Sequence, residues 1–483
     1  MEKTNEKSKK TNGFPLKLNY KRTMIIGFAF FGILLLWQVY DSWCSTFLTE
    51  LFKEALSADK EEEVQYLVGV MMALDNLAAL IMLPIFGHLS DKTHTKIGKR
   101  MPYILVGTFL CAVTFPFIPV FFHYHNIVGT IITMAIVVFF AMMYRNPAVA
   151  LMPDITPKPL RSKANGIINI MGYVGGACAT IVGIAFTLSS YLGGSGSPLW
   201  RNHEGNIWII EIPFLVASVL MIISALCLFF SINENKVEAE MKNDMALGEK
   251  YAAVETPIED NKPMSKANKI MLFLILGAEF FWFMADNGIG TFMNNYTLYH
   301  LYASSGSNMI NVIVGGVGSV LGFAIGGMIA SKIGRKWTVV SGLILTVLGL
   351  TLWTILAYSI PVHAPATGET NPFPIYLYFV WFIKGFGMSL VHVNSFPMVV
   401  ELCSSKKIGK FTGYYYAASM AAQTITPCLL GLLLLSPAFS FNLLPVYALI
   451  CACVALAIFL FIKNVKVKKV AIKTGLEAIG DEE

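Results

Sequence analysis

The stretch Gly32–Asp41, GILLLWQVYD, returns 245 residues later as Gly277–Asp286, GAEFFWFMAD. In both copies an apolar run carries a tryptophan followed four residues later by an aspartate, and the match continues to Thr46-Phe47 and Thr291-Phe292. Each copy lies in an apolar stretch of more than 20 residues, the length that an α-helix needs to cross about 30 Å of hydrocarbon. The repeat therefore predicts a membrane protein with two duplicated halves.

Apolar stretches of this length occur twelve times in the 483 residues, of which 55% are hydrophobic and 14% charged. A soluble chain of this size has no interior large enough for so much apolar surface. The expected helices cover residues 24–52, 64–89, 102–122, 127–152, 164–188 and 207–231, and then 270–295, 309–329, 337–359, 375–400, 411–435 and 444–462. We therefore predict an all-α membrane protein with two pseudo-symmetric six-helix bundles, 24–232 and 270–462, joined by a linker, 233–269, with tails at 1–23 and 463–483.

The basic residues predict the orientation of these helices. Of 36 Lys and Arg residues, 31 lie in alternate gaps between the apolar stretches, three lie in the other gaps and two lie inside the stretches. Because Lys and Arg are retained on the cytoplasmic side, both termini and the linker are predicted to be cytoplasmic, in a plasma or inner membrane. The net charge of +6 then reflects topology and gives no reason to expect nucleic-acid binding. The first apolar stretch is too long for a cleavable signal.

A second repeated pattern follows the fourth and tenth expected helices. Asp154 precedes Gly166 by twelve residues, and Glu401 precedes Gly413 by the same twelve. Duplicated transporter halves commonly face each other around a substrate site near the middle of the bilayer and rock to expose it to each side alternately. We expect the site of this protein at the same place.

The loop between the second and third expected helices carries a resemblance to a known family. Gly87-His-Leu-Ser-Asp91 followed by Gly98-Lys99-Arg100 resembles the cytoplasmic signature of the major facilitator superfamily (MFS). The longer run Asp91–Pro102, with Asn146-Pro147 and Met152-Pro153-Asp154-Ile-Thr, resembles the glycoside-pentoside-hexuronide:cation symporters and among them the sucrose-transporter-like branch. This resemblance implies the MFS fold, sugar uptake driven by a cation gradient, and a cytoplasmic gate formed by Asp91, Gly98, Lys99 and Arg100, to which the repeat adds Asp154 and Glu401.

The same resemblance bears on the cation. Ala79, Met82 and Leu83 stand where the melibiose carriers of this family keep sodium ligands, and Arg145 stands where they keep an aspartate. The resemblance therefore implies that a proton is transported with the substrate, and sodium is the less favoured cation.

Six charged residues lie well inside the expected helices: Asp41, Asp75, Glu279, Asp286, Arg145 and Lys384. Each costs about 2.5 to 3.5 kcal/mol at a helix centre, so six facing lipid would cost roughly 15 to 20 kcal/mol. We expect them to face a cavity lined by protein and to partner one another. Four acids against two bases leave room for two protons.

The candidate substrate residues follow from the repeat and from sugar chemistry. Trp37 and Trp282 each precede an aspartate, Asp41 and Asp286, by one helical turn, and a pyranose stacks on an aromatic plane while its hydroxyls donate to carboxylates. The alternative is that the tryptophans only pack and the aspartates only form ion pairs. Arg145 and His392 occupy equivalent repeat positions, and Lys384 is expected to pair with Asp286 or Glu279. Other candidates for hydroxyl recognition are Gln38, Tyr40, Asn287, Asn294, Asn394 and Gln423.

Asp75 has no acidic counterpart in the second half, where Gly315 takes its place. An asymmetric acid inside the membrane, followed by Asn76, is the best candidate for the cation-coupling site. The alternative is a charge lock between Asp75 and Arg145. The two interpretations overlap, since protonation of Asp75 would release such a lock.

The sequence thus predicts a proton-coupled symporter of a di- or oligosaccharide or a glycoside. A lipid or drug carrier of the same fold is the first alternative, and a non-transporting membrane receptor is the second. No nucleophile and base set, metal cluster or nucleotide-binding loop stands out, so we expect neither an enzyme nor a bound cofactor or metal. The expected partners are the sugar, the coupling cation and the bilayer, and the expected state is a monomer.

Overall fold

The computed structural model describes residues 16–157, 160–187, 209–254, 264–366, 369–400, 402, 408–436 and 439–463. In the first half, the helices are α1 (Tyr20–Leu56), the short 3-10 helix η1 (Glu61–Val64), α2 (Gln65–Lys92), α3 (Met101–Thr114), α4 (Phe117–His123), α5 (Ile127–Asp154), α6 (Arg161–Ala185) and α8 (Glu211–Ser231). Helix α9 (Glu234–Val254) follows. In the second half they are α10 (Lys266–Asn295), the π-helical turn η3 (Tyr296–His300), α11 (Ser305–Ile333), α12 (Arg335–Ser359), α13 (Ile375–Val400), α14 (Ile408–Leu434) and α15 (Leu443–Leu460).

Within these residues, twelve spans are long and apolar enough to cross a membrane, as the sequence predicts. The third span is divided into α3 and α4 at Phe115-Pro116, because proline cannot donate to the preceding turn. The seventh span continues from α10 into η3. The predicted all-α fold with twelve membrane-spanning helices is confirmed.

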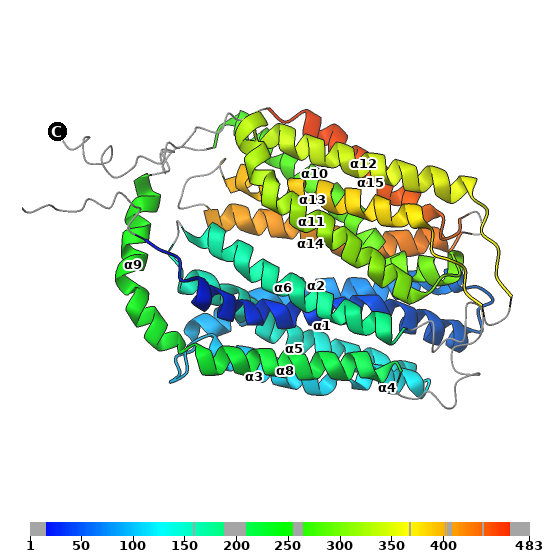
Figure 1. Ribbon diagram of the computed structural model, residues 1–483, viewed down its shortest axis with the longest axis horizontal. Helices are drawn as coiled ribbons and strands as arrows, with labels where there is room; N and C mark the ends of the chain where they lie inside the picture. The colour runs from blue at the N-terminus through cyan, green and yellow to red at the C-terminus, as the bar shows by residue number, and fades with distance from the viewer. Residues whose placement is uncertain are drawn as a thin grey trace, which may run out of the picture.

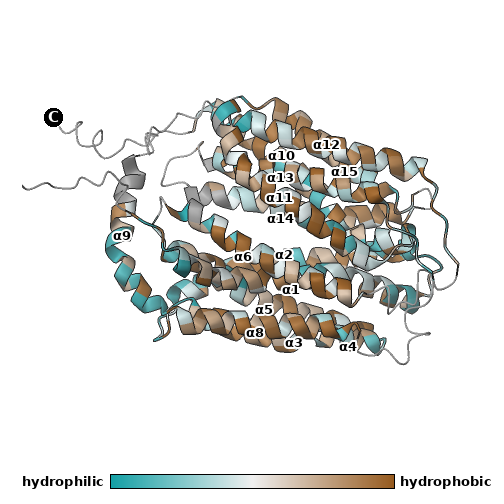
Figure 2. Ribbon diagram, viewed as in Figure 1, coloured by the Kyte–Doolittle hydropathy of each residue, from teal (hydrophilic) through white to brown (hydrophobic). Residues whose placement is uncertain are grey.

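The helices form two bundles that lie side by side (Figure 1). Helices α1 to α8 make up the first, and α10 to α15 make up the second. Extensive packing within the bundles joins α1 to α6, α3 to α5, α11 to α13 and α10 to α15. The helices of both bundles are built largely of hydrophobic residues (Figure 2). Many large apolar side chains are exposed on them, including Phe230, Phe273 and Ile375, each at least 74% exposed. Such a surface is stable in contact with acyl chains rather than with water.

Short polar side chains cap several of the helices where each chain segment enters the bundle. Asn19 accepts the backbone N–H of Arg22 at the start of α1, and Asn126 accepts that of Gly129 at the start of α5. In the second bundle, Ser265 accepts the N–H of Asn268 at the start of α10. These caps satisfy N–H groups that have no partner within their own helix.

The linker contains a helix that the sequence analysis did not predict. Helix α9 is polar (Figure 2) and runs across one end of the two bundles (Figure 1). The side chain of Asn235 donates to the carbonyl oxygens of Thr95 and Lys96, so α9 is held against the loop between α2 and α3. Below, the end of the molecule at α9 is called the linker side and the opposite end the far side.

Close contacts between the bundles gather at the far side. A side chain at Gly69 near the start of α2 would meet the backbone of Pro427, and one at Gly431 near the end of α14 would meet Gln65. A side chain at Gly183 near the end of α6 would meet Met309. Glycine therefore permits backbone approach where the far ends of the bundles meet.

Candidate functional site

A cavity of about 390 Å³ lies between the bundles, within the range of small-molecule sites. Helices α1 and α6 line it from the first bundle, and α10, α11 and α13 line it from the second. More than half of its lining residues are polar or charged. The polar and charged lining residues are Gln38, Asp41, Ser42, Tyr173, Asp286, Asn294, Asn308, Ser319, Lys384, Ser389 and His392.

Asp286 and Lys384 form an ion pair in the wall of this cavity. The Lys384 Nζ donates to Asp286 Oδ1 at 2.5 Å, joining α13 to α10. The same Nζ lies 5.9 Å from the ring centroid of Trp381, which also lines the cavity. The Lys384 side chain is 15% exposed and that of Asp286 is 41% exposed, so the carboxylate is the more accessible partner.

Glu279 does not share this lysine, although the sequence left that possibility open. Its side chain is fully buried, and neither carboxyl oxygen has a hydrogen-bond partner among the described residues. The Lys384 ammonium donates to Asp286 instead, seven residues further along α10. Of the two partners expected for Lys384, the structure therefore gives Asp286 and not Glu279.

Asp41 opens onto the cavity from α1, opposite the ion pair. Arg145 of α5 lies near enough to influence the Asp41 carboxyl electrostatically. Its guanidinium carbon lies 5.7 Å from the centroid of the Trp37 ring, in a cation–π arrangement. Trp37 in turn meets the edge of Tyr40, with 5.5 Å between the ring centroids. Trp37 and Arg145 thus form a layer behind Asp41 and are not part of the cavity lining.

Trp282 lies away from the cavity, in contrast to its expected role as a sugar platform. It is 1% exposed and packs against Phe459 of α15, with 6.3 Å between the ring centroids. Its indole N–H has no partner among the described residues. Trp282 lies four residues before Asp286, but the two side chains do not both reach the cavity. The residues of α10 that line the cavity begin at Asp286 and lie toward the far side. The tryptophan that does line the cavity is Trp381.

The remaining candidates on α10 and α13 divide between the cavity and the helix packing. His392 lines the cavity, and its ring lies 5.4 Å from that of Phe283. Asn394 donates to the Leu390 carbonyl of its own helix and is 3% exposed. The Asn287 Oδ1 is buried without a partner among the described residues, and Asn287 lies outside the cavity lining. Of these three, His392 alone is placed to meet a ligand in this cavity.

Asp75 lies beside α1 and has a neutral partner. The Tyr40 hydroxyl donates to Asp75 Oδ2 at 2.6 Å. No ion pair between Asp75 and Arg145 is present among the described residues, because Arg145 lies over Trp37 instead. The alternative of a charge lock between them is therefore wrong for this conformation. Asn76 donates to the carbonyl of Gln423 at 3.1 Å and so joins α2 to α14 of the other bundle.

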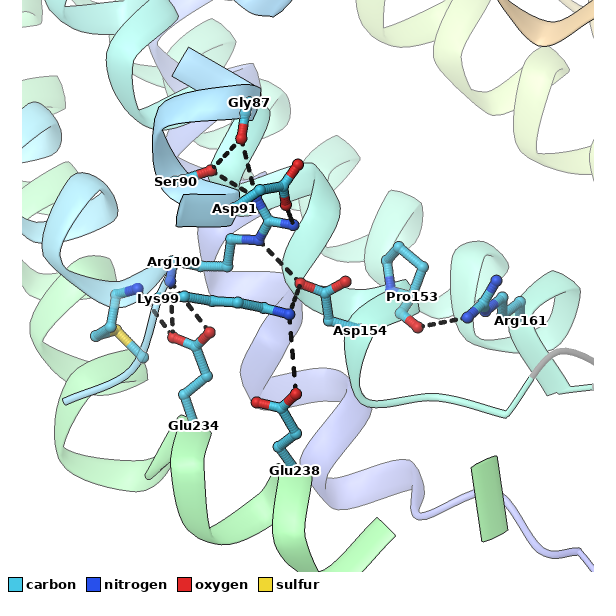
Figure 3. Close-up of polar contacts among 11 residues, drawn as sticks. Gly87, Ser90, Asp91, Lys99, Arg100, Pro153, Asp154, Arg161, Glu234 and Glu238 are labelled. Carbon is cyan, nitrogen blue, oxygen red and sulfur yellow. Dashed lines mark hydrogen bonds and ion pairs between the residues drawn. The ribbon is translucent and has the colours of Figure 1, made fainter. Parts of the chain in front are cut away.

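The gate residues form one network at the linker side, centred on Arg100 (Figure 3). Its guanidinium donates to Asp91, to Asp154 at 2.9 Å and to the Ser90 hydroxyl at 2.5 Å. Lys99 lies 3.3 Å from Asp154 and 3.9 Å from Glu238 of α9. Burial alone would lower the pKa of Arg100, but Asp154 and Asp91 raise it above its ordinary value.

Glu234 connects α9 to this network. Its carboxylate accepts the backbone N–H groups of Arg100 and Met101 at 3.0–3.1 Å, at the N-terminus of α3 (Figure 3). Gly98 has φ +119°, and a side chain there would meet the Glu234 carboxylate. Gly98 was predicted from the loop motif, whereas Glu234 was not. The signal was an acid at the first position of a helix within the linker.

The gate network lies within the first bundle and α9. It joins α2, α3, α5 and α9, and its described members include none from the second bundle. Glu401, its expected counterpart, lies outside the described residues. In this conformation the network fixes the linker-side ends of the first bundle to one another.

Several cavity residues were not anticipated, among them Tyr173, Asn308 and Trp381 and the serines Ser42, Ser319 and Ser389. Trp381 had a usable signal, because it precedes Lys384 by three residues and therefore shares its helix face. Tyr173 and Asn308 are an ordinary tyrosine and asparagine in apolar stretches. Only the packing of α6 and α11 brings them to the cavity.

Comparisons with known proteins agree with this architecture. The family model described as Major Facilitator Superfamily matches residues 38–317 and 275–478. No curated protein matches the chain in sequence. Among solved structures, the partially occluded, inward-open xylose transporter XylE from E. coli has a TM-score of 0.61 at 13% identity, covering 93% of this chain and 99% of that one. A D-xylose-proton symporter has a TM-score of 0.59 at 17% identity, covering 92% and 97%.

A peptide transporter POT in complex with alafosfalin is as similar in fold. Its TM-score is 0.60 at 12% identity, covering 92% of this chain and 93% of that one. At such identities these likenesses show the fold alone. The family match spans nearly the whole chain and indicates a multi-pass membrane transporter rather than an enzyme. The chain belongs to the major facilitator superfamily.

Proposed function

We propose that this protein is a proton-coupled sugar symporter that works by alternating access, with a di- or oligosaccharide or glycoside as substrate. The observation that carries the proposal is the cavity between the bundles, where Asp41, His392 and the Asp286–Lys384 pair meet. Because Asp286 neutralises the charge of Lys384, this pair offers hydrogen bonds to a ligand without adding net charge to the wall. Such a wall suits a neutral, hydroxyl-rich ligand.

Trp381 supports the same substrate class. Its ring lines the cavity beside Lys384, so it supplies the aromatic surface expected for the apolar face of a pyranose. The neighbouring folds include both xylose and peptide transporters, so fold similarity does not choose between sugars and peptides. A lipid or drug carrier is disfavoured because two acids, a lysine and a histidine line the wall: Asp41, Asp286, Lys384 and His392. Membership of the glycoside-pentoside-hexuronide:cation symporters, and of their sucrose-transporter-like branch, is part of the same proposal.

We place proton binding at Asp75, with Asp41 beside it. Asp75 has no cationic partner among the described residues, and a single hydrogen bond from the Tyr40 hydroxyl is all that favours its ionised form, so this carboxyl group inside the membrane is suited to bind a proton. Tyr40 and Asp41 are adjacent on α1, which links Asp75 directly to the cavity. Protonation there therefore couples to ligand binding over a short distance.

We further propose that the linker side is cytoplasmic and that this conformation faces inward. The excess of Lys and Arg in the gaps on that side supports the orientation. The inward-facing state is supported by the far-side contacts of Gly69, Gly183 and Gly431 and by an inter-bundle hydrogen bond of 2.5 Å from Tyr299 to Glu50.

Uptake into proteoliposomes tests the proposal. A panel of labelled mono- and disaccharides is offered with an imposed pH gradient or sodium gradient, and dipeptides and lipophilic amines are added as competitors. We expect the pH gradient to drive accumulation of a sugar. Accumulation driven by sodium alone would contradict proton coupling, and inhibition by dipeptides or amines without any sugar uptake would contradict the substrate class.

Asp75→Asn isolates the coupling acid. It should abolish accumulation against a gradient while sugar counterflow, which needs no net proton movement, continues. Asp59→Asn, which removes an exposed acid in the far-side loop, serves as the matched control and should behave as wild type. If Asp75→Asn still accumulates sugar against its gradient, Asp75 is not the coupling residue.

A further inference from the structure

Two asparagines at the far end of the cavity have buried oxygens without partners. Asn294 is near the end of α10 and is 3% exposed, and Asn308 is near the start of α11 and is 7% exposed. Both line the cavity, and in both the Oδ1 atom has no hydrogen-bond partner among the described residues. A buried acceptor without a donor is costly, so a pair of them beside a cavity indicates that a ligand completes them.

The orientation of the Asn294 amide can be deduced from a backbone carbonyl that lies three side chains away. The Glu61 carbonyl only accepts, so Gln65 must point its Nε2 toward it, at 2.9 Å. Gln65 Oε1 then faces Asn295, which must donate from Nδ2 at 3.1 Å. The orientations of the Gln65 and Asn295 amides, and with them the positions of their hydrogens, are thereby fixed by this series of hydrogen bonds.

The series of hydrogen bonds continues from Asn295 through Thr46 to Asn294 at the cavity. Asn295 presents its Oδ1 to Thr46, so the Thr46 hydroxyl donates its single proton there, at 2.8 Å. Thr46 can then only accept from Asn294, whose Nδ2 donates at 2.9 Å. The amide of Asn294 is thus held with its Oδ1 unpaired, and this oxygen is a fixed acceptor.

We propose that Asn294 and Asn308 form a subsite that reads two hydroxyl donors of the substrate at the closed far end of the cavity. Two carbonyl acceptors select a ligand that presents two O–H groups, such as neighbouring hydroxyls of a sugar ring. The proposal rests on the proposed function and adds the residues that would choose among sugars.

The subsite is also connected to the closure of the far side. Thr46 belongs to α1 and Asn294 to α10, so the bond that orients the acceptor is itself a bond between the two bundles. When the far side opens, this bond must break and the amide becomes free to turn. The subsite therefore binds its hydroxyls most tightly while the far side is closed, and Thr46 is a positioning residue.

Binding of the tightest sugar in the panel is compared with binding of its singly deoxygenated and fluorodeoxy analogues. Fluorine keeps the size of the hydroxyl but cannot donate. Asn294→Leu and Asn308→Leu should each weaken binding of the parent sugar about tenfold to a hundredfold. Each should leave unchanged, within about twofold, the affinity for the one analogue that lacks the hydroxyl it reads.

Thr46→Val should reduce discrimination at the same hydroxyl as Asn294→Leu, and Thr46→Ser, which keeps the hydroxyl, should restore it. Thr351→Val is the matched control, because the Thr351 hydroxyl donates within its own helix α12, to the Val347 carbonyl. Thermal unfolding verifies that each variant is folded. If the variants bind sugar but discriminate among the analogues as wild type does, this inference is wrong while the proposed function stands. If wild type binds no hydroxylated ligand, both are wrong.

Discussion

Lys384 and Asp286 illustrate how a charge is tolerated inside a bundle. The ammonium group is mostly buried but has one carboxylate at 2.5 Å and the face of Trp381 beside it. Removing one partner of such a pair leaves an uncompensated charge, which costs more than the pair itself contributes. The ion pair is therefore better tested as a pair than by one substitution.

We expect Asp286→Asn to lower the free energy of unfolding by about 1–3 kcal/mol, less than for a fully buried pair because Asp286 is 41% exposed. The double variant Asp286→Asn/Lys384→Met should recover part of this loss, since the charge is removed with its partner. Thermal or denaturant unfolding of the purified protein measures both. A double variant less stable than Asp286→Asn would contradict this account.

At the scale of elements, α9 is the part of the linker that the structure ties to the first bundle. It is polar and would not be stable as an isolated helix of 21 residues without contacts along one side. Glu234, Asn235 and Glu238 supply those contacts with the loop between α2 and α3. The loop geometry and the docking of α9 should therefore fail together.

Gly98→Ala tests this dependence. Alanine is strained at φ +119°, and its Cβ would lie 2.1 Å from the Glu234 carboxylate. We expect faster hydrogen exchange throughout α9 and about 1–2 kcal/mol of lost stability. Gly166→Ala, where nothing lies within 4 Å, is the control and should leave exchange in α9 unchanged. Equal exchange in both variants would show that Gly98 does not support the docking.

The docking of α9 should also depend on pH. Burial raises the pKa of Glu234 above its usual 4.5, and the N–H groups of Met101 and Arg100 offset only part of this effect. A carboxyl group with a raised pKa in the folded state contributes its full stability below the usual pKa and loses it as pH rises through the raised value.

Hydrogen exchange in α9, corrected for the intrinsic rate, should therefore accelerate as the pH rises from about 4.5. Glu234→Gln cannot titrate and should show a flatter profile over the same range. If wild type and Glu234→Gln respond equally to pH, another group controls the docking.

For the whole molecule, the important property is that the two bundles meet closely at one end. At the α2–α14 contact, a Cβ on Gly69 would lie 2.1 Å from the backbone oxygen of Pro427. The Sγ of Cys428 lies 4.0 Å from the Gly69 carbonyl oxygen, so this cysteine reports on the same contact. A side chain added at Gly69 should therefore shift the equilibrium between the two conformations toward the one in which the far side is open.

We expect Gly69→Ala to raise the labelling rate of Cys428 by a membrane-impermeant maleimide several-fold, because the contact that shields Cys428 is pushed apart. Cys428→Ser measures the labelling of the other cysteines and is subtracted. Gly176→Ala on α6, where nothing lies within 4 Å, should label as wild type does. A Gly69→Ala protein that labels at the wild-type rate would show that this contact does not hold the far side closed.

The sequence by itself determined the class of the molecule and its internal repeat. The length of the apolar stretches and the repeat of Gly32–Asp41 as Gly277–Asp286 can be read from the order of residues alone. Within the bilayer such segments form helices, because a helix satisfies the hydrogen bonds of its own backbone. The gate was also accessible, because Asp91 and Arg100 are nine residues apart in one loop.

The tertiary structure alone decided which charges meet and which face the cavity. Trp37 and Trp282 occupy equivalent repeat positions, yet one lies under Arg145 and the other against Phe459. Asn308 joins the cavity because α11 packs against α13 and α6, whereas Glu279 on α10, which packs mainly against α14 and α15, is buried without a partner among the described residues. The physical reason is that helix periodicity fixes which residues share a face, while the rotation of each helix against its neighbours is set by side-chain packing over the whole bundle.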